Sequence, residues 1–441
     1  MPKKDSPKSK QETKIDLSTN CGGIKAPNPF WLASGPPTNS GEQVMRAFEQ
    51  GWGGVVWKTM TQDPPILNVT SRYGALDIGK QKMAGFNNIE LTTDRSLDDN
   101  LREISEVKKK FPKHAVVASM MVPCEKQQWQ DIVKKVEDAG CDGLELNFGC
   151  PHGLSERGMG AAVGQVPEYV KMVTEFVKEI STTPVIVKLT PNVTDIRYPA
   201  RAAKAGGANG VALINTIKSF IGVDLDTLQP KFSVDGKIAY GGYCGPAVKP
   251  IALYMVSTLA ADNDCKGLAI SGIGGISNWV DAAEFMLLGA SSIQVCTAVM
   301  HHGFKIVDPM IKGLSGWMLK HGFVKIDDFA GKTVSNVVDW GKLNLHAKTM
   351  AAINKEKCIG CGICLTACRD SGHRGMNIDH VNGNKIPYVA AEYCVGCNLC
   401  SVVCPVNKCI TMKTVETGHP PLTWEEYIAQ GQKGYKGVHK R

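Results

Sequence analysis

The stretch GLAISGIGGISNWVDAAEFMLLGASSIQVCTA, residues 267–298, carries the pattern that decides the main fold. A short apolar run at 267–270 leads into the glycine-rich turn SGIGG, and a second run at 292–295 leads into Cys296 and Thr297. Barrel enzymes build their sites from residues that directly follow parallel strands, and they commonly bind a phosphate after the last two strands. The stretch therefore predicts the end of a (β/α)8 barrel that binds a phosphate-bearing cofactor.

Eight short apolar runs of this kind alternate with segments of helical periodicity. Examples of these segments are GEQVMRAFEQ (41–50), EKQQWQDIVKKVEDAG (125–140) and PEYVKMVTEFVKEI (167–180). The alternation predicts a parallel sheet, either closed into a (β/α)8 barrel or open and doubly wound. Polar residues or glycines at the ends of the runs favour the barrel. The runs lie at 30–33, 54–57, 115–121, 143–146, 184–189, 210–214, 267–270 and 292–295, and the residues at their ends include Ser34, Lys58, Asn147, Lys188, Asn215, Gly272 and Thr297.

Cysteine spacing predicts a second, smaller domain. Half of the 16 cysteines lie between Cys358 and Cys404, in two runs of the form C-x2-C-x2-C-x3-C. This is the spacing of bacterial ferredoxins, in which the last cysteine of each run binds the other cluster. The spacing predicts two 4Fe-4S clusters, one held by Cys358, Cys361, Cys364 and Cys404, and the other by Cys394, Cys397, Cys400 and Cys368.

Two structural zinc sites are the alternative, because CxxC pairs alone also bind zinc. Two complete four-cysteine runs favour the clusters. The first run departs from the usual pattern, since Arg369 rather than proline follows it and 25 residues separate Cys368 from Cys394. We expect this insert to form a loop or a short hairpin and to leave ligation intact.

The composition is that of a globular protein. The chain has 441 residues, 43% hydrophobic and 21% charged, and it contains no stretch that is long and apolar enough to predict a membrane span. The lysine-rich residues 1–14 lead into no apolar segment, so we expect no secretory signal and a cytoplasmic protein. Nearly all of the net charge of +8 resides in residues 1–14 and 431–441. A nearly neutral body with two solvated basic tails argues against a nucleic-acid partner.

Electron-carrying clusters beside a phosphate-binding barrel suggest flavin mononucleotide as the cofactor of the barrel. A flavin converts single electrons into hydride transfer, which the clusters cannot do alone. Lys58 and Lys188 at strand ends also permit a Schiff-base aldolase, but an aldolase leaves eight cysteines without a role. Gly272-x-Gly274 and Gly158-Met159-Gly160 lack the spacing or the strand context of a dinucleotide fingerprint, so the sequence indicates no NAD site.

Several segments resemble one enzyme family. LELNFGCPHGLSERGMG (144–160), VKLTPNVTD (187–195), YGGYCGPA (240–247) and both cysteine runs resemble the catalytic part of NAD-dependent dihydropyrimidine dehydrogenases, in particular the bacterial catalytic subunit. That subunit has a dihydroorotate-dehydrogenase-like barrel followed by a two-cluster ferredoxin domain. On this basis we expect an FMN-binding barrel at 15–335, a ferredoxin-like domain at 336–415, a disordered tail at 1–14 and a C-terminal tail at 416–441.

The resemblance implies roles for residues at the strand ends. Cys150 matches the catalytic acid, and a thiol with an ordinary pKa of about 8.5 stays mostly protonated at neutral pH and can donate a proton to carbon. Outside such a setting a cysteine is more often a small buried hydrophobe. Gly149 stands where the animal enzymes have serine. The family's pyrimidine-binding positions match Asn88, Glu90, Asn147, Asn215 and Thr216, and its flavin contacts match Ser34, Lys58, Lys188, Gly242, Gly274, Gly275, Cys296 and Thr297.

Glu90 favours a neutral substrate, because a carboxylate repels the carboxylate of dihydroorotate but accepts an N–H of uracil or thymine. The resemblance implies that electrons pass through the clusters to the flavin, that hydride reaches C6 of the pyrimidine, and that Cys150 protonates C5, reversibly. Without an NAD site, the electrons are expected from a NAD- and FAD-binding flavoprotein subunit, in a hetero-oligomer. The alternatives are a dihydroorotate dehydrogenase and an electron-relay subunit with an idle barrel.

Overall fold

The computed structural model describes residues 15–67, 69–77, 83–151, 157–381 and 384–435. The chain divides into two compact units, Met1–Val337 and Val338–Arg441. The basic segment 1–14, the last six residues, and residues 152–156 of the loop that follows Cys150 lie outside the described residues.

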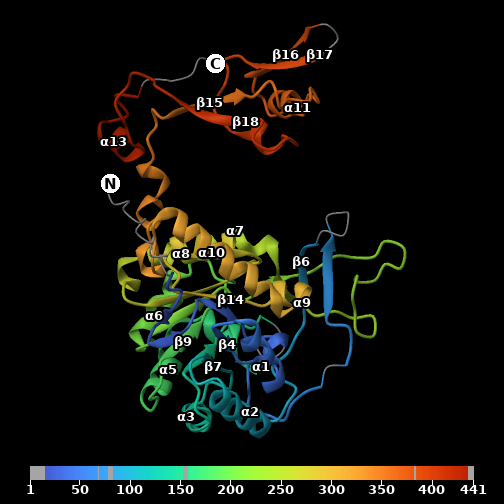
Figure 1. Cartoon of the computed structure of the whole chain (residues 1–441), viewed down its shortest axis with the longest axis vertical. Helices are drawn as coiled ribbons and strands as arrows, with labels where there is room; N and C mark the ends of the chain where they lie inside the picture. The colour runs from blue at the N-terminus through green and yellow to red at the C-terminus, as the bar shows by residue number, and fades with distance from the viewer. Residues whose placement is uncertain (1–14, 68, 78–82, 152–156, 382–383, 436–441) are drawn as a thin grey trace, which may run out of the picture. The chain divides into compact units, whose positions relative to one another are not determined.

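The first unit contains a closed barrel of eight parallel strands, which confirms the predicted (β/α)8 fold (Figure 1). The pairing follows chain order, and the barrel closes where Ile293 of the last strand lies opposite Phe30 of the first. The strands are β3 (Phe30–Leu32), β4 (Gly54–Val56), β7 (Ala115–Met120), β8 (Gly143–Asn147), β9 (Val185–Lys188), β10 (Gly210–Leu213), β13 (Ala269–Ile273) and β14 (Ser292–Val295).

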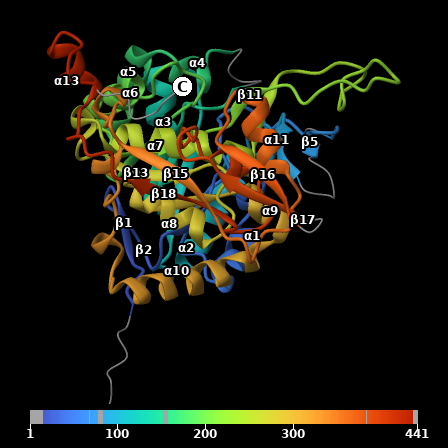
Figure 2. The ribbon, with the colours of Figure 1, turned by 90° about the horizontal axis from the view of Figure 1, so that it is seen from above.

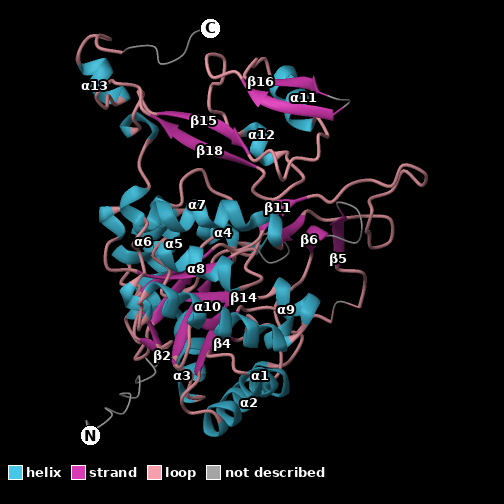
Figure 3. Cartoon of the chain, turned by 45° about the horizontal axis from the view of Figure 1, so that its top comes forward, coloured by secondary structure: helices cyan, strands magenta, loops and turns pink. Residues whose placement is uncertain are grey.

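Helices surround the strands of this unit (Figure 3). Local sequence signals set their ends. The first begins after Ser40, whose hydroxyl accepts the N–H of Gln43, and ends at Gly51, whose φ of 110° suits glycine. The helices are α1 (Gly41–Gln50), α2 (Leu97–Lys110), α3 (Lys126–Asp138), α4 (Ala161–Gly164), α5 (Pro167–Lys178), α6 (Arg197–Ala205), α7 (Lys249–Ala260), α8 (Trp279–Leu287), α9 (Thr297–His302) and α10 (Val307–His321).

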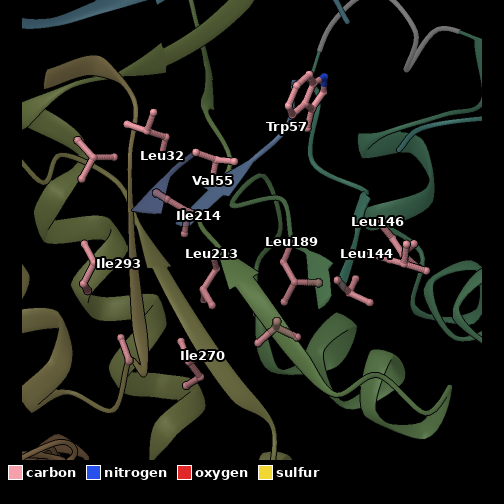
Figure 4. Packing of buried hydrophobic residues seen from close by; sticks show 14 of the residues in the cluster. Leu32, Val55, Trp57, Leu144, Leu146, Leu189, Leu213, Ile214, Ile270 and Ile293 are labelled. Carbon is pink, nitrogen blue, oxygen red and sulfur yellow. The ribbon is translucent and has the colours of Figure 1, made fainter. Parts of the chain in front are cut away.

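Alternate residues of the barrel strands belong to two different layers. Leu32 and Val55 lie in the large core between strands and helices (Figure 4), whereas their neighbours Trp31 and Val56 belong to a separate apolar cluster. Successive side chains of a strand point to opposite faces, so this second cluster fills the interior of the barrel. The same alternation turns a set of polar side chains inward, namely Lys58, Ser119, Glu145, Asn147, Lys188, Ser271 and Gln294.

The antiparallel hairpin of β1 (Thr19–Cys21) and β2 (Ile24–Ala26) precedes the barrel (Figure 2). Ile24 belongs to the interior cluster. A Cβ on Gly143, the first residue of β8, would lie 2.3 Å from the Ile24 side chain, so glycine at that position makes room for it.

Two connections of the barrel contribute strands to an additional antiparallel sheet, in the order β11-β12-β6-β5. Its strands are β5 (Tyr73–Asp77), β6 (Met83–Asn88), β11 (Ile217–Ser219) and β12 (Gly241–Cys244). These strands were not predicted from the sequence, because they lie in the connections between the apolar runs and the helical segments that indicate the barrel.

The seventh barrel strand differs from its predicted limits. The apolar run was expected to end at Ile270, but β13 continues to Ile273. A Cβ on Gly272 would lie 2.6 Å from the Phe285 ring, so this glycine allows strand and helix to pack closely. Ser271 and Gly272 therefore belong to the strand, and only Gly274 and Gly275 remain for the turn.

The second unit is built around an antiparallel pair, β15 (Lys348–Ile353) and β18 (Ile410–Val415). Two helices, α11 (Ile363–Asp370) and α12 (Leu399–Val402), begin within the two cysteine runs. The insert between the runs forms an antiparallel hairpin, as expected, from β16 (Met376–Val381) and β17 (Asn384–Val389).

The segment predicted as a C-terminal tail contains structure. Helix α13 (Trp424–Ala429) begins at a capping box in which Thr423 and Glu426 exchange hydrogen bonds. Leu422 before it is buried, and its N–H donates to Asn344 Oδ1 at 3.1 Å. Residues 422–429 are thus packed into the second unit. None of the helices in the described part of the chain is both long and apolar enough to cross a membrane.

Candidate active site and cluster sites

One cavity collects the residues predicted for catalysis in the barrel. It lies at the carboxyl ends of the barrel strands, and the residues at or just after the end of each strand line its wall. With the exception of Gly242, every predicted site residue of the barrel lines it: Ser34, Lys58, Asn88, Glu90, Asn147, Cys150, Lys188, Asn215, Thr216, Gly274, Gly275, Cys296 and Thr297.

Gly242 lies one step behind the cavity wall. Its carbonyl accepts a hydrogen bond from Asn88 Nδ2 at 2.9 Å. A Cβ at Gly242 would lie 2.0 Å from Thr216 Oγ1, so glycine is required for Thr216 to pack there. The side chain of Asn88 therefore ties β6 to β12 in addition to facing the cavity.

Charged groups form a compact cluster at Glu90. Lys58 Nζ lies 2.7 Å from Glu90 Oε1, while the Tyr73 hydroxyl donates to Oε2 at 2.6 Å and Arg72 Nε lies 3.4 Å from Oε2. Burial by itself raises the pKa of Glu90, but the hydrogen bonds and positive charges around it, Lys58 foremost, lower that pKa overall. The same burial and the neighbouring carboxylate raise the pKa of Tyr73. Glu90 is thus a carboxylate, and Tyr73 a neutral phenol, at neutral pH.

This cluster corrects the argument that Glu90 alone repels a carboxylate substrate. Two cations flank Glu90, so the local charge is positive rather than negative. A negatively charged substrate meets a lysine and an arginine as well as a glutamate. The charge of Glu90 therefore gives no argument against dihydroorotate as a substrate.

Two amide side chains lie side by side in the cavity wall. Asn215 Nδ2 donates to Asn147 Oδ1 at 3.0 Å, and Asn147 Nδ2 donates to Thr59 Oγ1 at 2.9 Å. A Cβ at Gly149 would lie 2.3 Å from Asn215 Nδ2. The glycine that stands at the family's serine position thus leaves the space that Asn215 occupies.

Cys150 lies in the cavity wall at the start of the glycine-rich loop. Its carbonyl accepts the N–H of Ala161 at 3.0 Å, which ties the loop to α4. Its side chain packs against Met121 and Met159, both of which are buried.

The cavity also has the features that a flavin phosphate and ring require. Gly274 and Gly275 have φ values of 127° and 71°, and a Cβ on Gly275 would lie 2.8 Å from the Lys249 backbone nitrogen, so bare backbone faces this corner. Lys58 and Lys188 supply positive charge. Gln294 Oε1 is buried and has no partner among the described residues, which leaves it as an acceptor for a bound group. The residues present fit FMN.

The Cys296 thiol lies in the same wall, and burial raises its pKa to about 12. A Cβ on Gly35 would lie 2.7 Å from its sulfur, so the glycine permits this approach. Cys296 is therefore a neutral thiol in the cavity at neutral pH.

In the second unit, two hollows separate the eight cysteines as the crossed pattern predicts. Cys404 lines one hollow together with Cys358, Cys361 and Cys364, whereas Cys368 lines the other together with Cys394, Cys397 and Cys400. No group of three or more His, Cys, Asp or Glu residues in the described ranges is spaced to hold a single metal ion. A cubane gives each thiolate its own iron and needs wider spacing than one tetrahedral ion does. The two sets fit 4Fe-4S clusters.

The loops of the two runs have the same backbone design. Gly360 and Gly362 in the first run, and Gly396 and Asn398 in the second, have positive φ values between 65° and 77°. Asparagine is the residue besides glycine that visits this region most readily. These turns bring the first two cysteines of each run to the same hollow as the third, which lies in the first turn of α11 or α12.

Iron analysis tests this assignment. The protein purified anaerobically is expected to contain about eight irons and eight acid-labile sulfides per chain, four of each from every cubane. Cys404→Ser should alter the EPR signal of the cluster held by the first run, and the matched control Cys368→Ser should alter the other signal. A colourless zinc protein, or a Cys404→Ser variant that changes only the second-run cluster, would contradict the crossed assignment.

Sequence reasoning missed several residues at these sites. Tyr73 and Arg72 carry no motif and reach Glu90 from the start of β5 and from the residue before it. Gln294 was detectable in principle, because a glutamine in the apolar run SIQV marks an inward position of the last strand. Cys409, which follows the second run, is buried and lines the first hollow beside the four predicted ligands.

Comparison with known proteins assigns both units. Residues 16–318 match the dihydroorotate dehydrogenase family, and residues 351–412 match the 4Fe-4S dicluster domain. A subunit of Escherichia coli NAD-dependent dihydropyrimidine dehydrogenase, PreA, is 40% identical over 402 residues, which cover 91% of this chain and 96% of that protein. The chloroplastic dihydropyrimidine dehydrogenase (NADP(+)) of Arabidopsis thaliana is 42% identical over 74% of this chain and 79% of its own.

A third relative has a different activity. The catalytic subunit of dihydroorotate dehydrogenase B (NAD(+)) from Pyrococcus abyssi is 36% identical over 315 residues, or 71% of this chain. Those 315 residues are 98% of the archaeal protein. The match therefore covers nearly the whole archaeal protein but leaves more than a quarter of this chain without a counterpart in it.

Proposed function

We propose the function from the family assignment: this chain belongs to the dihydroorotate dehydrogenase family, and the E. coli relative, whose 402-residue match is too long to lie in the first unit alone, is a dihydropyrimidine dehydrogenase subunit. This chain is an oxidoreductase that acts reversibly on the 5,6 bond of uracil or thymine. FMN is the cofactor of the barrel, and two 4Fe-4S clusters are the cofactors of the second unit. Cys150 is the acid, and Asn88, Glu90, Asn147, Asn215 and Thr216 bind the pyrimidine.

The observation that carries this proposal is the combination of sites in one chain. The cavity holds a thiol beside two amide side chains, and the second unit holds two four-cysteine hollows. Amides suit the alternating donors and acceptors of a pyrimidine ring, and a thiol suits proton transfer to carbon. The match with the E. coli relative covers 402 residues, 91% of this chain, and therefore includes residues of both units.

The residues of the cavity divide the chemistry among them. FMN, when bound, supplies hydride to C6 of the pyrimidine. Cys150 supplies the proton at C5 and takes it back in the reverse direction. Lys58 and Lys188 place positive charge beside the flavin, and the Gly274–Gly275 turn offers backbone N–H groups to its phosphate. Asn147 and Asn215 orient the pyrimidine from one wall of the cavity. Glu90, held by Lys58 and Tyr73, contacts the pyrimidine from another wall.

The reducing equivalents come from outside the chain. The E. coli relative is named a subunit of an NAD-dependent enzyme. A flavoprotein subunit that binds NAD and FAD is the partner that fits a chain whose own sequence offers no dinucleotide fingerprint. Cluster-binding thiols are kept reduced in the cytoplasm, which is where we place the enzyme.

Dihydroorotate is the second candidate substrate. The archaeal relative acts on it, and Lys58 and Arg72 beside Glu90 would tolerate its carboxylate. The cluster unit argues for dihydropyrimidines instead, because the E. coli relative, whose match must include that unit, is a dihydropyrimidine dehydrogenase subunit.

Reduction of the bound flavin by each substrate separates the two. Under anaerobic conditions, dihydrouracil or dihydrothymine is expected to bleach the flavin absorbance of the holoenzyme, whereas dihydroorotate at the same concentration should leave it unchanged. Dithionite serves as the control that the flavin of each sample can be reduced. Bleaching by dihydroorotate alone would replace the proposed activity with that of the second candidate.

A further inference from the structure

A fully buried carboxylate lies beneath the cavity without lining it. Glu145, in the middle of β8, is 0% exposed. Ser119 Oγ donates to its Oε1 at 3.1 Å, Gln294 Nε2 donates to its Oε2 at 3.4 Å, and Lys188 Nζ lies 3.5 Å from Oε1. A buried ionised carboxylate costs several kcal/mol unless charges and hydrogen bonds offset that cost. The three partners therefore stabilise the buried carboxylate of Glu145, and Glu145 fixes the positions of their side chains.

The contact with Lys188 links Glu145 to the cofactor side of the cavity. Lys188 and Gln294 both line the cavity, and both reach back to the same carboxylate. The Gln294 amide donates to Glu145 and to Ser271 Oγ at 2.9 Å, so its oxygen is the atom left over. Glu145 thus orients two groups that face the bound flavin.

The contact with Ser119 links Glu145 to the substrate side. A carboxylate only accepts hydrogen bonds, so the single proton of the Ser119 hydroxyl points at Glu145. Ser119 Oγ then accepts the proton of Thr59, 3.0 Å away, and Thr59 Oγ1 in turn accepts from Asn147 Nδ2. Every donor in this chain of hydrogen bonds points toward Glu145.

The direction of the chain continues into the two amides. Asn147 Oδ1 accepts from Asn215 Nδ2 and from the N–H of Gly149 at 3.1 Å, and Asn215 Oδ1 accepts the N–H of Thr216 at 2.8 Å. Both amide oxygens are therefore engaged by the protein. Each Nδ2 has a second hydrogen with no protein acceptor in the described part of the chain, and both residues line the cavity. Two N–H donors therefore remain for a ligand, together with one lone pair of Asn215 Oδ1.

We propose that Glu145 is a positioning residue for both ligands of the cavity. Through Lys188 it fixes positive charge beside the flavin, and through Ser119 and Thr59 it fixes Asn147 and Asn215 with their N–H groups toward the pyrimidine. Paired N–H donors match the carbonyl oxygens of a 2,4-dioxopyrimidine and oppose the amino group of a 4-aminopyrimidine. The inference rests on the proposed function, and it adds the device that selects uracil over cytosine.

Ser119→Ala tests the substrate side, because Ser119 is fully buried and does not line the cavity. Loss of one internal hydrogen bond should weaken uracil binding about fivefold, measured by the perturbation of the flavin spectrum, and narrow the preference for uracil over cytosine. Flavin content should stay at the wild-type level. Ser257→Ala is the matched control, since Ser257 is also buried but bonds only to the Tyr254 carbonyl in α7.

Glu145→Gln tests the cofactor side. Removal of the negative charge beside Lys188 should shift the midpoint potential of the bound flavin to more positive values, and uracil binding should weaken at least as much as in Ser119→Ala. If Glu145→Gln fails to fold, comparison of Ser119→Ala with Ser257→Ala still tests whether the hydrogen bonds to Glu145 position the substrate amides. Wild-type uracil affinity and selectivity in Ser119→Ala overturn the inference.

The wild-type protein separates this failure from that of the proposed function. If dihydrouracil does not bleach its flavin, the proposed function is wrong whatever the variants do. If dihydrouracil does bleach it, and the Ser119→Ala and Ser257→Ala proteins behave alike, only the role of Glu145 is wrong.

Discussion

Cys150→Ala is expected to lower the turnover of uracil by about a hundredfold or more, which is the usual contribution of a positioned general acid. The thiol lies in the cavity wall against Met121 and Met159, and its removal leaves the Gly274–Gly275 turn and both lysines in place. Flavin content should therefore persist while proton transfer to C5 fails. Cys150→Ser should be nearly as damaging, because a hydroxyl is a much weaker acid than a thiol. The measurement is steady-state reduction of uracil with an artificial donor.

A control cysteine shows whether the effect is specific. Cys124 follows β7, is partly buried and does not line the cavity, so Cys124→Ala should turn over pyrimidine at close to the wild-type rate. Wild-type turnover by Cys150→Ala would mean that the loop after β8 has only a structural role.

The second large effect is all-or-none. The isolated chain is expected to reduce uracil with an artificial low-potential donor but not with NADH, and an added NAD-binding flavoprotein subunit should restore NADH-dependent turnover. The glycine pairs of the sequence serve the barrel turn and the loop after β8, and neither has the form of a dinucleotide site. The assay compares the two donors with and without the partner. Robust NADH-linked turnover by the chain alone, with no co-purifying subunit, would reveal an overlooked nucleotide site.

The cluster unit offers a surface on which to test the partner's contact. Ile359 and Val402, which adjoin or follow cluster cysteines, are 67% and 73% exposed. Exposed apolar side chains beside a redox group are suited to a partner that must come close. Val402→Lys should therefore weaken the NADH-dependent reaction and spare the reaction with the artificial donor. Leu319→Lys, on an exposed position of α10, is the matched control.

Local patterns in the sequence were sufficient for the parts of the protein that local rules determine. Strand–helix alternation predicted the barrel because helices repeat their apolar residues with a helical period, whereas the buried strands appear as short apolar runs. The CxxC spacing predicted which cysteines share a hollow because ligation geometry fixes it. That strand ends such as Lys58 and Asn147 line one cavity was predictable because the carboxyl ends of parallel strands in a barrel lie at one rim.

Contacts between distant segments could not be read in this way. Glu90 was expected to act as a lone anion, but Arg72 pairs with it and the hydroxyl of Tyr73, at the start of β5, donates to it. β13 runs past its apolar residues, because Gly272 packs against Phe285 and not because of its own propensity. The segment at 422–429 folds because Leu422 and Trp424 find partners near 340–344. Each of these outcomes depends on a residue far away in the chain.

The close packing of Gly149 against Asn215 bears on how this cavity can differ from that of family members with serine at the position of Gly149. Any side chain at position 149 would collide with Asn215 Nδ2, which lies 2.3 Å from where a Cβ would sit. A lineage could not exchange glycine for serine here by one tolerated step while Asn215 keeps its bond to Asn147. The serine-bearing members are therefore expected to hold this asparagine in a different rotamer, without its hydrogen bond to the neighbouring amide, so that the same residue type meets the substrate in two different ways within one family.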